Sequence, residues 1–136
     1  MKISVFLLLV TYFHFMHVLT EQELHNLAMN IVGKQLEEED FEFLAVNSEL
    51  KKNPQFVCTK EKKMHFIVVK HIGYPGDPRD IDFFRSDLNK MRDHAIKFEA
   101  RTFYAAVGLV NSNDYNLPVY LDEEYIVDYD GLIEIE

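Results

Sequence analysis

The stretch from residue 53 to residue 70 most constrains the fold of this chain, because it has the pattern of a β-hairpin. It reads NPQFVCTKEKKMHFIVVK. Pro54 can open the first strand, at residues 55–59, since the first residue of a strand need not donate a hydrogen bond. A charged turn at residues 60–63 leads into a second strand at 64–72, whose centre is almost entirely apolar, as in strands covered on both faces. We therefore expect a sheet with a layer on each side.

Two amphipathic helices and two further strands are predicted around this hairpin. Residues 20–36 place their apolar residues on one helical face, and Thr20 and Glu23 have the spacing of a capping box. Residues 81–100 show a similar apolar stripe. Residues 41–46 and 101–110 have strand patterns. The order of these elements predicts an α+β (α/β) domain in which a mixed sheet is flanked by two helices.

The C-terminal end of the chain is predicted to form one more β-hairpin. Residues 125–129 and 132–135 are rich in strand formers, and they flank Asp130-Gly131, a turn signal.

The first nineteen residues are predicted to be separable from a single domain that spans residues 20–136. Lys2 followed by an apolar run has the outline of a secretory signal, which would make the protein secreted or periplasmic. A second interpretation is a mis-assigned start, with the true beginning at Leu19-Thr20, which would make the protein cytoplasmic. A retained anchor is the third, although 17 residues from Ile3 to Leu19 lie at the lower limit for crossing a bilayer.

The hairpin and the element order together resemble the restriction-endonuclease-like PD-(D/E)XK superfamily, whose core has the order αβββαβ. The motif of that family places Asp after the proline, and Glu or Asp two residues before the lysine. Here Gln55 follows Pro54, and Val68 precedes Lys70 by two residues. In the family the two carboxylates bind a divalent cation that activates water. The resemblance therefore implies a degenerate site of Gln55, Val68 and Lys70 that has no metal, no cofactor and no catalytic residue.

This reading favours a catalytically inactive, nuclease-like binding or structural module rather than an enzyme. An alternative is a metal-dependent nuclease or phosphodiesterase that uses Mg²⁺ through carboxylates at new positions. The loop at residues 71–80 holds two prolines and two glycines and follows the strand that ends at Lys70. Loops on rigid scaffolds often carry function. The candidate cleft residues are Glu23, Glu42, His71, Asp77 and Asp80.

The charge of the chain restricts its partners. The chain has 23 acidic residues against 14 Lys and Arg, and its net charge is −9. Broad nucleic-acid binding depends on clustered Lys and Arg, so nucleic acid is not the expected partner. Seven acids and no Lys or Arg lie between Asp122 and Glu136. This acidic, tyrosine-bearing segment is a candidate surface for a protein partner, and a small exported partner-binding protein is the third functional reading.

Overall fold

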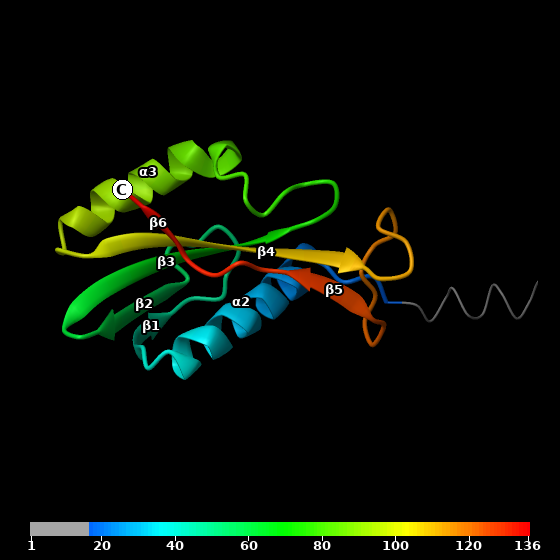
Figure 1. Ribbon diagram of the computed structural model, residues 1–136, viewed down its shortest axis with the longest axis horizontal. Helices are drawn as coiled ribbons and strands as arrows, with labels where there is room; N and C mark the ends of the chain where they lie inside the picture. The colour runs from blue at the N-terminus through cyan, green and yellow to red at the C-terminus, as the bar shows by residue number, and fades with distance from the viewer. Residues whose placement is uncertain (1–16) are drawn as a thin grey trace, which may run out of the picture.

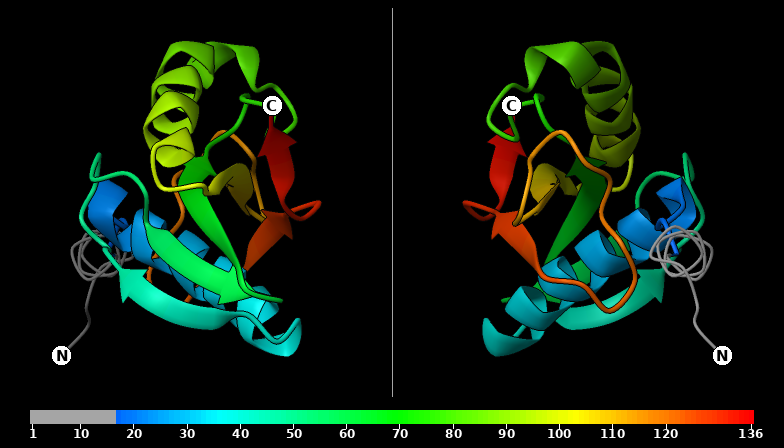
Figure 2. Two further views of the ribbon diagram at one scale, coloured as in Figure 1. Left: turned by 90° about the vertical axis from the view of Figure 1, so that its left-hand side faces the viewer. Right: turned by 90° about the vertical axis from the view of Figure 1, so that its right-hand side faces the viewer.

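The computed structural model describes residues 17–136, which form a three-layered domain with one sheet between two helices (Figure 1). The expected α+β class, with a mixed sheet flanked by two helices, is confirmed. Figure 2 shows that the two helices lie on opposite faces of the sheet. The elements are α2 (Glu21–Glu38), β1 (Glu42–Val46), β2 (Phe56–Lys60), β3 (Lys63–Ile72), the 3₁₀ helix η1 (Asp82–Phe84), α3 (Arg85–Ile96), β4 (Arg101–Asn111), β5 (Tyr125–Asp128) and β6 (Ile133–Ile135).

The sheet has the strand order β1-β2-β3-β4-β5, and β6 also pairs with β4. Strands β1, β2 and β3 form an antiparallel meander, whereas β3 and β4 are parallel and are joined through α3. The predicted central hairpin is present, and its turn consists of Glu61 and Lys62 alone. Both residues have positive φ, 53° and 64°, as required in the two-residue turns that match the twist of a hairpin.

The predicted C-terminal hairpin is wrong, because β5 and β6 do not pair with each other. Both run antiparallel to β4 on the same side of it. Between the β5 pairing and the β6 pairing, β4 advances by four residues, from Tyr104 to Gly108. The opposing segment advances by five residues, from Asp128 to Ile133. The segment around Gly131 is therefore a bulge in one interrupted strand line. The long edge of β4 offers more backbone hydrogen bonds to this segment than a short hairpin would.

The core divides into two parts that lie on the two faces of the sheet. Alternation along β3 sends Ile67 and Val69 toward α2 and Val68 toward α3. Helix α2 begins with the predicted capping box, in which Thr20 N donates to Glu23 Oε1 at 3.0 Å and Glu23 N donates to Thr20 Oγ1 at 3.1 Å. Apart from strand residues, the core includes Ala28, Met29, Val32 and Leu36 of α2 and Leu88 and Ala95 of α3.

The structure describes only the end of the hydrophobic leader, since residues 1–16 lie outside the described residues. Residues 17–19 belong to the leader by sequence, yet they pack against the domain. Val18 forms a β-bridge with Tyr120, and Leu19 N donates to Val119 O at 3.0 Å. Within residues 17–136, no helix combines the length and the apolar character that a bilayer crossing requires.

Candidate functional site

The candidate site is centred on Gln55, at the point where the chain enters β2. The backbone N–H of Gln55 donates to Ile67 O at 3.0 Å, and its side-chain Oε1 accepts from Val69 N at 2.7 Å. Gln55 therefore binds the two residues of β3 that flank Val68. Its Nε2 donates to Asn53 Oδ1 at 2.8 Å and to Lys52 O at 3.2 Å. The side chain is 1% exposed, and its amide has a partner for each polar atom.

Val68 and Lys70 lie on the α3 face of β3, and Gln55 binds the residues on either side of Val68, so the three residues of the predicted degenerate site are neighbours. Val68 is 1% exposed and packs with Leu88 and Tyr104. Lys70 is half-buried, and its Nζ lies 5.4 Å from the centre of the Phe84 ring. Burial lowers the pKa of Lys70, and the nearby Asp87 carboxylate of α3 opposes this shift in part. The predicted site therefore consists of packed apolar side chains around Val68, with the ammonium group of Lys70 beside them.

Three of the five candidate cleft residues line one cavity beyond the end of β3. His71, Asp77 and Asp80 border a cavity of about 250 Å³ together with the rings of Phe83 and Phe84. Both carboxylates already bind within their own loop. Asp77 Oδ1 accepts from Arg79 N and lies 2.9 Å from Arg79 Nε, and Asp80 Oδ1 accepts from Asp82 N.

The other two candidate residues, Glu23 and Glu42, do not line this cavity. Glu23 belongs to the cap of α2, where its carboxylate also meets His17 Nε2 at 2.8 Å. These contacts with His17 and Thr20 lower the pKa of Glu23. Glu42 is exposed on β1, across from Thr59 of β2. Across residues 17–136, no three His, Cys, Asp or Glu side chains gather in a way that could hold a metal ion.

Arg79 is a residue of this region that the sequence analysis missed. Its guanidinium makes two hydrogen bonds of 2.9 Å to Asp128 and one of 3.2 Å to Asp130, which connects the loop after β3 to β5. Gly108 of β4 makes room for this contact, because a Cβ there would lie 2.9 Å from Pro78 Cγ and 3.0 Å from Asp128 Cβ. The sequence could have predicted this contact, because Arg79 is the one Arg in the loop and the C-terminal acidic segment contains no Lys or Arg.

His25 is a second missed residue, and it lies on the α2 face of the sheet. It is 2% exposed, and its Nε2 has no hydrogen-bond partner among the described residues. Burial lowers the pKa of His25, and the nearby His71 lowers it further. The ring is therefore a buried polar group on the inner side of α2. The helical period carried this signal, because His25 falls on the same face as the buried Ala28 and Val32, three and seven residues later.

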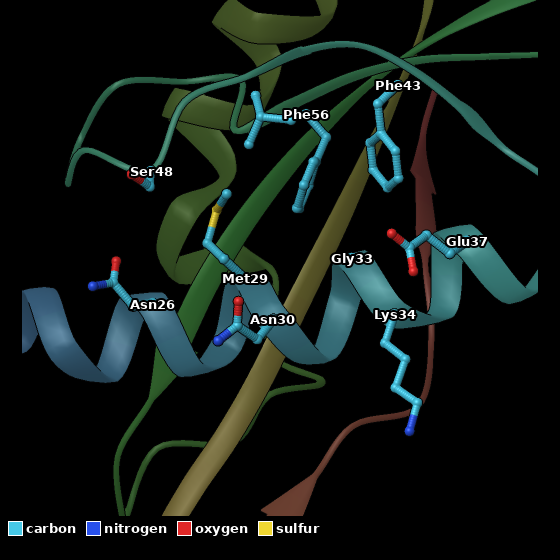
Figure 3. A pocket seen from close by; sticks show the side chains of 10 residues that line it. Asn26, Met29, Asn30, Gly33, Lys34, Glu37, Phe43, Ser48 and Phe56 are labelled. Carbon is cyan, nitrogen blue, oxygen red and sulfur yellow. The ribbon is translucent and has the colours of Figure 1, made fainter.

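A further groove lies on the same face, between α2 and strands β1 and β2. It has a volume of about 700 Å³, and Figure 3 shows its polar and apolar sides. Asn26, Asn30 and Lys34 border it from α2, and Phe43 and Phe56 form its apolar wall. This groove was not predicted, because the wet side of one helix and the inner side of two strands meet only in the folded chain.

Comparison with known proteins gives a family but no described relative. The family described as "Domain of unknown function (DUF8840)" matches residues 22–135, which is nearly the whole described domain. No curated protein and no solved structure matches the chain significantly.

Proposed function

The chain belongs to the DUF8840 family of domains of unknown function, and from the geometry of its own site we propose that it is a non-catalytic binding module on a nuclease-like scaffold. This proposal rests on the hydrogen bonding and the burial of the Gln55 side chain. A metal ligand needs a free oxygen lone pair that is directed into an open site. The Gln55 oxygen instead accepts from Val69 N, and the side chain is almost fully buried.

The position of Val68 supports the same reading. A carboxylate at this position would require a cation or a hydrogen-bond donor, since burying an unpaired charge is costly. Val68 instead fills the space beneath α3 beside Leu88, and Lys70 directs its charge over the Phe84 ring. The part of the chain that would hold the reacting groups of a nuclease thus contributes packing and hydrogen bonds to the fold.

The element order supports the nuclease-like scaffold. A helix, an antiparallel three-stranded meander, a crossover helix and a strand parallel to the third strand follow one another in the chain. This is the αβββαβ order of the PD-(D/E)XK core. The third reading, an exported partner-binding protein, depends on residues 1–19 being a working signal, and the binding role proposed here does not require it.

Melting in the presence of metal tests this proposal against the nuclease with relocated ligands. A metal held with a Kd of ~50 μM would stabilise the fold by about 2.7 kcal/mol at ~5 mM, which raises the midpoint by several degrees. We expect no shift with Mg²⁺ or Mn²⁺ beyond that given by NaCl of equal ionic strength. A shift that disappears in Asp77→Asn/Asp80→Asn would support the relocated ligands, and a shift that survives that variant would also contradict the proposal.

A further inference from the structure

We propose that the outer edge of β5 binds an extended, basic segment of a protein partner, which adds a strand to the sheet. This inference rests on the proposed binding function, because it names the surface and the chemistry of the partner. Strand addition uses backbone hydrogen bonds for affinity and side-chain pockets for specificity.

The backbone of β5 is suited to receive a strand. Its four residues pair in unbroken register with β4, from Tyr125 with Asn111 to Asp128 with Gly108. No described strand covers its outer side, since β5 ends the strand order. At the opposite end of the order, β1 pairs with β2 through a bulge between Phe43 and Ala45, a feature that disturbs an edge. β5 is therefore the better template of the two edges.

The side chains of β5 also leave apolar surface open to water. Tyr125, Ile126 and Val127 are 37%, 38% and 44% exposed, so each face of this short strand presents some apolar surface to solvent. A groove of about 400 Å³ adjoins the start of β5, between α2 and residues 120–125. Its apolar lining includes Leu27 and Leu121. Such a groove can accept an apolar side chain from a strand that lies along β5.

The charge beside β5 identifies the partner as basic. Asp122, Glu123 and Glu124 come directly before the strand and are exposed. Within residues 17–136, these three carboxylates form no ion pair, whereas Asp128 at the other end of the strand is held by Arg79. Exposed acids without an ion-pair partner in the described part of the chain, placed beside an edge strand, attract Lys and Arg and raise the rate of association with a basic segment.

The same charge argues against a second copy of this chain. If two β5 strands paired antiparallel, residues 122–124 of each copy would lie near the other copy's Asp128 and Asp130. Acids would then face acids, and like charges placed opposite each other across strands are destabilising. The segment that fits is an extended one in which basic residues alternate with apolar residues.

Fluorescence anisotropy with a labelled peptide of alternating Lys and Val tests this inference. We expect binding that weakens as salt rises, and no binding of the same peptide after N-methylation of alternate amides, which removes its strand-pairing donors. Glu123→Lys/Glu124→Lys should weaken binding about tenfold or more at low salt. The matched control is Glu38→Lys/Glu39→Lys, which changes the net charge equally on exposed residues at the end of α2. It should change binding by less than about twofold at the same salt.

Three results would overturn the inference: no binding of the Lys–Val peptide, equal weakening by the two charge-reversal variants, or unchanged binding of the N-methylated peptide. The thermal midpoint of each variant shows whether it is folded. Addition of the peptide should change the NMR chemical shifts of the β5 amides and leave those of the β1 amides unchanged. The metal melting experiment measures metal binding and does not depend on strand addition to β5. Loss of peptide binding without a metal shift therefore rejects this edge alone, whereas a metal shift rejects the non-catalytic role.

Discussion

Replacing Gln55 by Met should destabilise the domain by about 2–4 kcal/mol. Methionine keeps the length of the side chain but makes no strong hydrogen bond. The substitution removes the bonds to Asn53 Oδ1 and Lys52 O, which contribute about 1 kcal/mol each. It also leaves Val69 N without its acceptor in a residue that is 0% exposed, and a buried orphan donor costs about 1–3 kcal/mol. Burial of the more apolar side chain offsets roughly 1 kcal/mol of this loss.

Gln22 provides a matched control for this substitution. Its amide also makes three hydrogen bonds: Nε2 donates to Asn26 Oδ1 and Ser48 O, and Oε1 accepts from Leu50 N. Gln22 is only partly buried, so water can replace the lost partners. Gln22→Met should therefore cost less than about 1 kcal/mol. Urea unfolding followed by circular dichroism measures both values, provided that the m-value is unchanged.

Gln55→Glu adds a pH dependence to the same test. The carboxylate would be buried and would face Asn53 Oδ1 and Lys52 O, so its pKa in the folded state should lie above the unfolded value of about 4.3. A raised carboxyl pKa gives stability below the unfolded pKa that is lost as pH rises. The variant should therefore approach the wild type near pH 4 and be weaker at pH 7. Equal costs for the Gln55→Met and Gln22→Met variants, or a pH-independent Gln55→Glu variant, would refute the reasoning.

Three further predictions follow from packing and burial. Gly108→Ala should cost about 1–3 kcal/mol in urea unfolding because its Cβ would meet Pro78, whereas Gly73→Ala, with nothing within 4 Å of its Cβ, should cost much less; equal costs would contradict the close contact. Cys58 is fully buried, and burial raises the pKa of its thiol to about 11, so a disulfide reagent should label it only after unfolding, and rapid labelling of the native protein would contradict this. Lys70→Met should raise the free energy of unfolding by up to about 1 kcal/mol at pH 7, because burial lowers the pKa of this lysine and penalises its charged form. The gain should shrink as pH rises toward the unfolded pKa of lysine, and a loss of stability at pH 7 would mean that the charge of Lys70 stabilises the fold.

The central part of the fold could be predicted because its signals are local. The capping box of Thr20 and Glu23 forms with both predicted hydrogen bonds. The apolar run in β3 lies between two layers as expected. Each of these features depends on the period of one element and on its neighbours in sequence, which the residue pattern contains directly.

The second helix was predicted less well at its ends. It was expected over residues 81–100, but α3 proper is Arg85–Ile96 and follows the short η1 helix. Phe98 falls within the predicted helix at a position of its apolar stripe, but it is 53% exposed. The stripe predicts which residues face the core only as long as the helix continues, and residues 97–100 form a turn that leads into β4.

The C-terminal segment and the cleft depended on long-range pairing. Asp130-Gly131 had the composition of a hairpin turn, but the free side of β4 and the bonds from Arg79 to Asp128 and Asp130 decide where the segment lies. In the cleft, His71, Asp77 and Asp80 are close in sequence and line one cavity. Glu23 and Glu42 would reach the cleft only if the start of α2 and the strand β1 lay beside it. In the structure neither residue lines the cavity beyond β3.

The interrupted strand line on the outer side of β4 has a consequence for incomplete chains. β4 is eleven residues long and mostly buried, and among residues 17–136 the strands that pair with its outer side are β5 and β6. A ribosome that has not yet released residues 125–136, or a protease that removes them, would leave this apolar strand with an unpaired side. Such fragments should self-associate, and chaperones and degradation enzymes would then act on them.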